Sequence, residues 1–195
     1  MTYTVNWFEI TGKANFEEYL ARFKGQPFLK FLEIGCFEGM ATRWMLDNIL
    51  TNPSSEITVV DTFEGSAEHK GNDNLKLATL MDRFEENVID VTTSGKVLIH
   101  KGMSKVMLRP LQFEYYDFIY VDGSHHADDA LQDLCLSWDL LKPGGLMICD
   151  DYAWNNHPDR LNACIAMDAF LACFEGRYEL LKKEYQLVLV KKEAV

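Results

Sequence analysis

Short apolar runs alternate with longer amphipathic segments along most of this chain. The apolar runs are rich in β-branched and aromatic residues, and continuous runs of this kind are typical of strands buried on both faces. They predict strands at residues 28–34, 57–60, 96–100, 116–121 and 146–149. Near the end of the chain, residues 178–181 and 185–191 form two further β-rich runs that are close enough to pair antiparallel.

The segments between these runs have apolar residues at helical spacing. The stripe is clearest where apolar side chains recur every three or four residues at Ala127, Leu131, Leu134, Trp138 and Leu141. Further helices are predicted at about 40–50, 74–88 and 160–174. The earliest helix is predicted to start at the N-cap residue Asn15 and to end at Gly25, after an irregular N-terminus.

Strands that alternate with helices through short connections predict an α/β fold, a doubly wound Rossmann-like three-layer sandwich. The chain has 195 residues, which is enough for one domain with a sizeable core and short for two. We therefore expect residues 1–27 to form an N-terminal helical cover segment and residues 28–195 to form a single ligand-binding domain.

The composition narrows the class of partner. The formal net charge of −11 argues against nucleic acid and anionic membranes, because both need clustered Lys and Arg. The five cysteines are scattered without a Cys-x-x-Cys pair, so neither a disulfide framework nor a zinc knuckle is expected. The sequence shows no signal-peptide pattern and no apolar run near the roughly 20 residues that span a membrane. These features predict a cytoplasmic protein.

Two neighbouring predicted strands end in carboxylates. The first runs into Asp122, with His125 just beyond it, and the second runs into Asp150 and Asp151. Because a strand, a crossover helix and a second strand form a parallel unit, both strand ends meet at one sheet edge. Like charges so close together raise each other's pKa unless a cation lies between them. The sequence therefore predicts a functional site at this edge, with a metal ion in it.

A glycine turn follows the first strand, where Glu33 is followed by Gly35 and Gly39 and a helix begins directly afterwards. Such a turn lets backbone N–H groups approach a ligand closely. Its spacing does not match G-x-G-x-x-G, so a pyrophosphate cradle is not indicated. Asp61 ends the second strand, where an acidic side chain can accept hydrogen bonds from a ribose diol. Together these features favour a cofactor that contains ribose.

The motifs and their order resemble those of the class I S-adenosylmethionine-dependent methyltransferases. Residues 31–39 are similar to the family's first motif, 60–66 to its second, 101–104 to its adenine-side turn and 141–145 to the turn before its fifth strand. The Asp-Gly-Ser-His and Asp-Asp-Tyr runs are similar to those of a small-domain group related to metal-dependent sugar and macrolide O-methyltransferases. The resemblance implies a seven-stranded, mostly parallel sheet with an antiparallel last strand. One departure lies in the first motif, where Phe37 replaces a central glycine.

The resemblance also implies the residues of the site. Asp61 would bind the ribose of S-adenosylmethionine, and residues 102–104 would border its adenine. The implied cofactor-binding residues are Glu33, Gly35, Cys36, Phe37, Gly39, Asp61, Thr62, Phe63, Gly102, Met103, Ser104, Asp122 and Gly123. The implied ligands of Mg²⁺ are Asp122, Asp150 and Asp151, and the implied catalytic residues are His125 and Asp122.

The chemistry of methyl transfer to oxygen agrees with these roles. A neutral alcohol is a poor nucleophile, so a divalent cation and a general base both help the reaction. Carboxylate oxygens suit Mg²⁺, and a histidine with a pKa of about 6.5 suits a base at neutral pH. His126 competes with His125 for that role. Weaker candidates for shaping or covering the acceptor pocket are Tyr152, His157, Trp154, Trp7 and Phe8.

We therefore expect Mg²⁺-assisted O-methylation of a small hydroxylated acceptor, either sugar-like or polyhydroxy. Alternatives are a metal-independent N- or carboxyl-methyltransferase, a non-catalytic S-adenosylmethionine-binding regulatory protein, and a nicotinamide oxidoreductase. Without a separate substrate domain, acceptor recognition falls to residues 1–27, to the polar loop at 62–73, to the loop after Asp151, or to a neighbouring subunit of a homo-oligomer.

Overall fold

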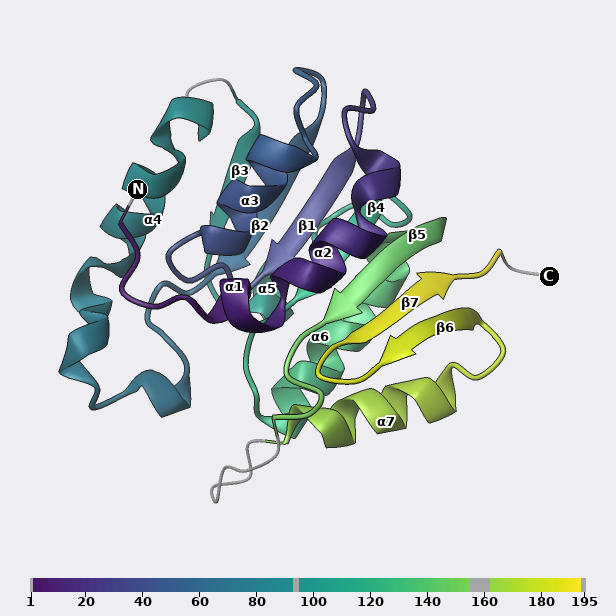
Figure 1. The fold of residues 1–195 in the computed structure, drawn as a ribbon. Helices are drawn as coiled ribbons and strands as arrows, with labels where there is room; N and C mark the ends of the chain where they lie inside the picture. Colours follow the sequence, from purple (N-terminus) through teal and green to yellow (C-terminus); the bar gives the residue numbers. More distant parts are fainter. Residues whose placement is uncertain (1, 93–94, 155–161, 194–195) are drawn as a thin grey trace.

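A computed structural model describes residues 2–92, 95–154 and 162–193, and its centre is a seven-stranded sheet (Figure 1). The strands are β1 (Lys30–Ile34), β2 (Glu56–Asp61), β3 (Val97–Lys101), β4 (Tyr116–Val121), β5 (Leu141–Cys149), β6 (Tyr178–Lys183) and β7 (Leu187–Lys191). Their spatial order is β3-β2-β1-β4-β5-β7-β6. The first five strands pair parallel, whereas β7 is antiparallel to both β5 and β6. The predicted fold class and the antiparallel last strand are confirmed.

The strand order reverses at β1 and β4, which lie side by side in the middle of the sheet. The chain leaves β1 toward β2 and leaves β4 toward β5, so the two connections run over opposite faces. In an open α/β sheet a crevice forms at this point, outside the carboxyl ends of the strands. The residues directly after β1 and β4 therefore border the crevice.

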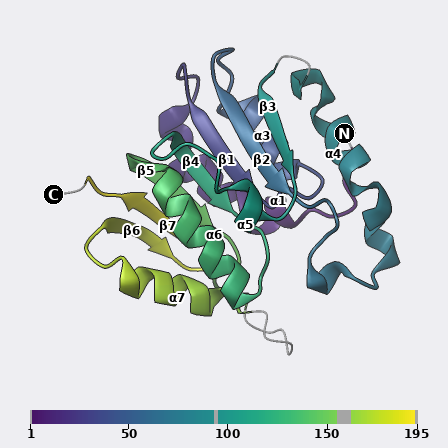
Figure 2. The same cartoon turned by 180° about the vertical axis from the view of Figure 1, so that it is seen from behind.

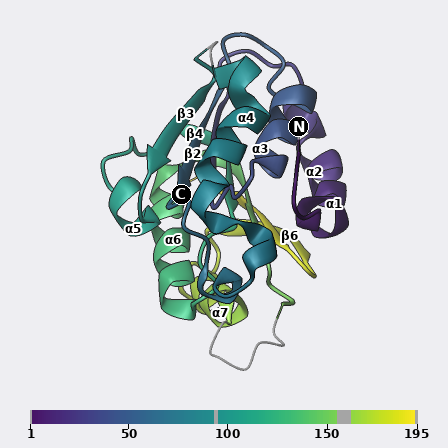
Figure 3. The ribbon, with the colours of Figure 1, turned by 90° about the vertical axis from the view of Figure 1, so that its left-hand side faces the viewer.

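Helices cover both faces of the sheet. On one face lie α1 (Trp7–Thr11), α2 (Lys13–Tyr19), α3 (Met40–Asn48) and α4 (Leu80–Thr92), and on the other lie α5 (Ser104–Met107), α6 (Ala127–Leu140) and α7 (Ala163–Cys173). Figure 2 shows the second layer from behind, and Figure 3 shows both layers from the side. Successive strand residues alternate between the layers, so Phe31 packs in one core and Leu32 in the other.

The N-terminal segment is fastened to the first helical layer. The Thr4 backbone N–H donates to Glu38 Oε2 at 2.7 Å, and the Thr4 hydroxyl donates to Oε1 at 2.8 Å. Arg83 on α4 donates to the same carboxylate at 2.7 Å, so the buried charge of Glu38 is paired. Phe16 on α2 is fully buried and packs edge-on against Phe118 of β4. These contacts hold residues 2–19 beside the crevice.

The start of the chain differs from its prediction. Helix α1 occupies a stretch that was expected to be irregular, and α2 begins at Lys13. Asn15 is therefore inside a helix and does not cap one. Its buried side-chain amide instead donates to Gln186 Oε1 at 2.7 Å, a contact with the C-terminal hairpin that local sequence does not reveal.

Two later boundaries also differ. Helix α4 begins at Leu80 and not near residue 74, because short 3₁₀ turns occupy the preceding residues and Lys76 has a left-handed backbone with φ of 47°. Strand β5 begins at Leu141, which pairs with Tyr116 before the register shifts, so the segment 142–145 predicted as a turn lies within an irregular strand. Within the described ranges, no helix is long and apolar enough to span a membrane.

Candidate active site

A cavity of about 760 Å³ lies at the carboxyl ends of β1, β2, β4 and β5. This volume is in the range of small-molecule binding sites. Its walls come from the N-terminal segment, the loops after these strands, the turn after β3 and the loop at 62–73. The cavity therefore lies at the reversal of strand order, where the sequence predicted a site.

The turn after β1 brings two strand ends unusually close together. A Cβ atom on Gly35 would lie 1.9 Å from the Asp122 backbone oxygen, and Gly35 has a φ of +80°. Both facts require glycine at this position. The close approach leaves the backbone after β1 and the backbone after β4 facing the same cavity, as the carboxyl ends of neighbouring parallel strands must.

Asp61 fastens the glycine turn from the end of β2. Its Oδ2 accepts hydrogen bonds from the backbone N–H groups of Cys36 at 2.8 Å and Phe37 at 3.0 Å. Its Oδ1 accepts from the Phe63 N–H at 2.7 Å. A carboxylate has about four acceptor positions, so these bonds leave limited capacity for a ribose hydroxyl. In this structure Asp61 shapes the glycine turn as well as lining the cavity.

Glu33 is a buried carboxyl on the cavity wall. It is 1% exposed and accepts a hydrogen bond from the Thr42 hydroxyl. Burial raises the pKa of Glu33 to about 8, against the lowering effect of the Thr42 hydrogen bond. An unpaired buried carboxyl is costly, so a cationic ligand group would be a favourable partner for it. The ammonium group of a bound amino acid moiety has that chemistry.

The other residues implied by the resemblance divide into two groups. Thr62, Gly102, Met103, Ser104 and Gly123 line the cavity, with Cys36 and Phe37. Phe63 instead packs against Phe84, with ring centroids 5.3 Å apart, in the core under the turn. Gly39 caps α3 with a φ of +79°, and a Cβ there would lie 2.8 Å from the Phe84 ring. These last two residues therefore support the turn from below.

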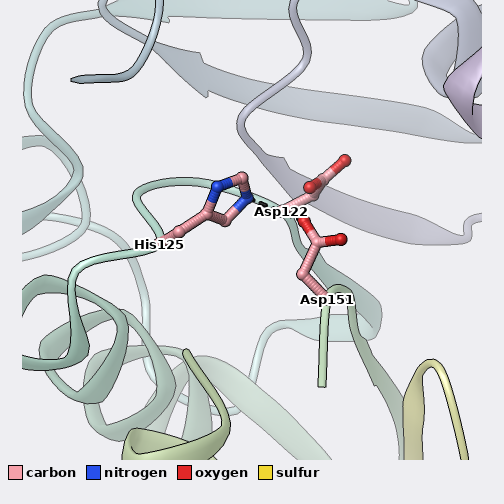
Figure 4. Close-up of side chains that lie close together, drawn as sticks. All are labelled: Asp122, His125 and Asp151. Carbon is pink, nitrogen blue, oxygen red and sulfur yellow. Dashed lines mark ion pairs between the residues drawn. The ribbon is translucent and has the colours of Figure 1, made fainter. Parts of the chain in front are cut away.

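The acidic edge contains His125 close to two carboxylates, those of Asp151 and Glu68. Figure 4 shows His125 with Asp151 and Asp122. His125 Nε2 lies 2.7 Å from Asp151 Oδ2, and His125 Nδ1 lies 2.9 Å from Glu68 Oε1. The side chains of all three residues are between 10% and 15% exposed. These contacts are close ion pairs, since neither ring nitrogen has a hydrogen-bond partner in the described part of the chain. Burial lowers the pKa of His125, but the neighbouring carboxylates of Asp151 and Glu68 outweigh it and raise the pKa to about 10. The imidazole is therefore protonated at neutral pH in this arrangement.

Asp150 also lines the cavity and has hydrogen-bond partners of its own. Its carboxylate accepts hydrogen bonds from the Tyr120 hydroxyl and from the Asp151 backbone N–H, the latter at 2.8 Å. Burial, with the neighbouring Asp151 charge, raises the pKa of Asp150 to about 6. Asp151 itself has a left-handed backbone with φ of 61° and accepts a hydrogen bond from the Tyr185 hydroxyl at 2.7 Å. The two adjacent aspartates thus face different surroundings.

Asp122, His125 and Asp151 offer ligand atoms that all lie within 4.8 Å of one another. Two carboxylates fit Mg²⁺, which commonly takes one or two protein carboxylates and completes its shell with water and substrate oxygens. Burial raises the pKa of Asp122 well above its usual value, and the charges of Asp150 and Asp151 raise it further. A cation would relieve this repulsion, so the donor set fits a divalent metal, with Asp150 outside it as the side chains stand.

The weaker candidates for the acceptor pocket and for the base lie in different parts of the structure. Trp154 packs edge-on against His125 with centroids 4.7 Å apart, and Trp7 stacks on His69 at 5.2 Å. Phe8 and His126 also line the cavity. Tyr152 instead donates a hydrogen bond to Asp168 of α7 at 3.1 Å. His157 lies outside the described residues.

Sequence reasoning missed Glu68 and Tyr185 as site residues. Both come from segments that are distant from Asp122 and Asp151 along the chain, and neither belongs to a recognisable motif. The polar loop at 62–73 was expected to contribute to acceptor recognition, but nothing local distinguishes Glu68 from the other acidic residues of that loop.

Comparisons with known proteins agree with this geometry. The family model described as "Methyltransferase domain" matches residues 32–152. The O-methyltransferase TomG from Streptomyces achromogenes, solved with S-adenosylmethionine, superposes with a TM-score of 0.64 at 16% identity, covering 93% of this chain and 79% of TomG. The O-methyltransferase NovP superposes with a TM-score of 0.66 at 18% identity, covering 84% of this chain and 72% of NovP.

A search of curated proteins gave no match. At these identities the structural comparisons show the fold, whereas the family match spans most of the segment from β1 to the loop after β5. The glycine turn, Asp61 and the acidic strand ends all lie within that matched segment. The chain therefore belongs to the methyltransferase-domain family and is an S-adenosylmethionine-dependent methyltransferase.

Proposed function

We propose that this enzyme transfers a methyl group to an oxygen of a small hydroxylated acceptor, with help from a divalent cation. The observation that carries the proposal is the cluster of Asp122, His125 and Asp151 at the cavity edge, next to the glycine turn. TomG and NovP, which share the fold, are both described as O-methyltransferases. A sugar-like or polyhydroxy acceptor fits a cavity whose walls include carboxylates and a histidine.

In this proposal, different residues of the cavity bind the cofactor, hold the cation and accept the proton. S-adenosylmethionine supplies an electrophilic methyl group on a sulfonium. The glycine turn and Glu33 hold the methionine part of the cofactor, while Asp61 and the segment 102–104 border its nucleoside. Asp122 and Asp151 would hold Mg²⁺, which stabilises negative charge that develops on an acceptor oxygen. His125 Nε2 takes the proton of the acceptor hydroxyl.

For His125 to act as a base, its Nε2 must leave Asp151. A histidine held by two carboxylates stays protonated, as the raised pKa of His125 indicates. The proposal therefore assigns Asp151 to two partners in turn, the imidazole in the free enzyme and a cation in the working enzyme. Trp154, which packs on the His125 ring, limits how far that ring can swing.

The test measures release of S-adenosylhomocysteine from a panel of hydroxylated acceptors, with Mg²⁺ or with a chelator. We expect turnover that the chelator abolishes, and a loss of about 100-fold or more in kcat for His125→Ala. His126→Ala is the matched control and should retain activity. Affinity for S-adenosylhomocysteine, measured by calorimetry, should survive both changes. Equal losses in the two variants would remove His125 as the specific base.

One observation favours metal-independent transfer as a second candidate. The protonated His125 already places a positive charge 2.7 Å from Asp151, which is what a metal ion would otherwise provide. Full activity in the presence of chelator, with an amine or a carboxylate as the best acceptor, would favour this candidate over the first.

A further inference from the structure

Glu68 has a buried position on an otherwise polar loop. Its side chain is 10% exposed, and both carboxylate oxygens are shielded from solvent. A carboxylate in such a place needs a positively charged or hydrogen-bonding partner. Among the described residues neither oxygen has a hydrogen-bond partner, and the nearest group that can be cationic is His125. His125 Nδ1 lies 2.9 Å from Glu68 Oε1 as an ion pair, while His69 Nε2 lies farther away at 3.7 Å.

The loop that carries Glu68 is anchored on both sides of this residue. The Ser66 backbone N–H donates to His69 Nδ1 at 3.1 Å, which closes the short 3₁₀ turn. The His69 ring then stacks on Trp7 with an interplanar angle of 11°, and Trp7 packs against Phe37 of the glycine turn, with ring centroids 5.2 Å apart. The position of Glu68 is thus defined by the N-terminal segment and the glycine turn together.

The two carboxylates on His125 are not equivalent. Asp151 contacts Nε2, is part of the candidate metal cluster and lies beside Asp122. Glu68 contacts Nδ1 and is outside that cluster. A carboxylate that accepts the Nδ1–H of a histidine fixes both the tautomer and the direction of the ring, which leaves Nε2 as the atom that exchanges a proton.

We propose that Glu68 is the positioning residue of this enzyme: with cofactor and cation bound, the ion pair at 2.9 Å tightens, and Glu68 accepts the Nδ1–H of His125 so that Nε2 faces the acceptor oxygen. This inference rests on the proposed function, in which His125 is the base. It gives the loop at 62–73 a defined role: when the loop is in place the base is oriented, and when it is displaced the base is not. Glu68 acts through His125 and does not itself contact the reacting atoms.

The first experiment needs no acceptor. Long-range ¹H–¹⁵N NMR of protein labelled at histidine nitrogens, with S-adenosylhomocysteine and Mg²⁺ bound, shows which ring nitrogen of His125 carries a proton shielded from exchange. His125→Ala assigns the signal. We expect a protected Nδ1–H in the wild type, in Glu68→Gln, which keeps an acceptor oxygen, and in the exposed α4 control Glu85→Ala. Glu68→Ala should lose it. A protected Nδ1–H that persists in Glu68→Ala overturns the proposal.

The second experiment is a double-mutant cycle on kcat, using the acceptor with the highest turnover in the panel. Removing a partner that orients a metal-binding histidine typically costs about 10- to 100-fold in activity, and we expect at least a loss of that size in kcat for Glu68→Ala. The KM for S-adenosylmethionine should stay within about twofold of the wild type. In the His125→Ala background the same change should cost nothing further, because its effect runs through the histidine.

The outcomes separate the two proposals. If Glu68→Ala lowers kcat equally in the presence and absence of His125, Glu68 has only a structural role and the inference fails. If kcat is unchanged and only the KM rises, Glu68 serves binding and the inference also fails. If His125→Ala retains wild-type turnover, the proposed function loses its base, whatever the NMR spectra show for Nδ1.

Discussion

The buried carboxyl of Asp133 lies beneath the cofactor cavity. Its effect on the pH dependence of the free energy of unfolding can be measured directly. Asp133 lies on α6, is 1% exposed, and its Oδ1 is a buried oxygen without a hydrogen-bond partner in the described part of the chain. Its Oδ2 would be 3.0 Å from a Cβ on Gly123, so it lies directly under the turn after β4. Replacing it with asparagine keeps the shape and removes the titration.

The sign of the effect follows from the two states. Burial raises the pKa of Asp133 to about 7 from the ordinary 3.8, and the Asp129 charge adds to this, against smaller lowering effects of a Ser104 hydrogen bond and of Lys105. The folded state therefore binds a proton that the unfolded state has released between these pH values. The stabilising contribution of the protonated carboxyl is complete below about pH 4 and is lost as the pH rises to about 7.

The magnitude follows from about 1.4 kcal/mol for each pH unit, which gives about 4 kcal/mol over the whole interval and about 3 kcal/mol between pH 5 and pH 7. We expect the free energy of unfolding of Asp133→Asn, relative to the wild type, to rise by about that amount between pH 5 and pH 8. Urea denaturation at a series of pH values measures the difference. The exposed Asp128→Asn on the same helix is the control and should show little pH dependence.

A difference between Asp133→Asn and the wild type that stays constant to within about 0.5 kcal/mol from pH 5 to pH 8 would refute the reasoning. It would mean that the carboxyl finds a partner or solvent when it ionises. If the free energies of unfolding of Asp133→Asn and Asp128→Asn changed equally with pH relative to the wild type, the pH dependence would arise from groups other than Asp133.

Further variants test the cofactor turn and the packing around it. Gly35→Ala should abolish calorimetric binding of S-adenosylhomocysteine, because its Cβ would overlap the Asp122 backbone oxygen, and normal affinity would contradict this. Glu38→Ala should lower the free energy of urea unfolding by about 3 kcal/mol, because it removes the ion pair with Arg83 and the hydrogen bonds that fasten the N-terminal segment. A loss below about 1 kcal/mol would show that this ion pair is dispensable. Phe16→Ala should cost about 3–5 kcal/mol in the same assay, as expected for a fully buried aromatic ring, unless the core collapses around it.

Much of the fold can be read from local patterns. The run at 116–121 predicted β4 with the bounds that the structure has, and the stripe from Ala127 predicted α6. These elements follow local rules, since side-chain period and β-branched content reflect the backbone geometry of a strand or helix. The prediction was wrong where a distant partner intervened. Asn15 reads as a cap, but its side chain pairs with Gln186 across the molecule.

In the candidate site, too, local sequence predicted some features, whereas contacts between distant segments decided others. The sequence itself places Asp122 and Asp151 at the ends of neighbouring parallel strands, because the crossover unit between them leaves little choice of topology. It gave no indication that the Asp150 carboxylate accepts a hydrogen bond from Tyr120, or that the Asp61 carboxylate fastens the glycine turn. Those hydrogen bonds depend on which donors folding brings near each oxygen.

The sequence by itself determined the order of strands and helices, the glycine turn and the concentration of carboxylates at one sheet edge, because each depends on backbone preferences within a few residues. Only the tertiary structure decided that Glu68 and Asp151 form ion pairs with the two nitrogens of His125. That arrangement arises because the loop at 62–73, stacked on Trp7 through His69, is packed over the end of β4. Burial and hydrogen-bond partners come from contacts between distant segments, and these give the cluster its electrostatic character.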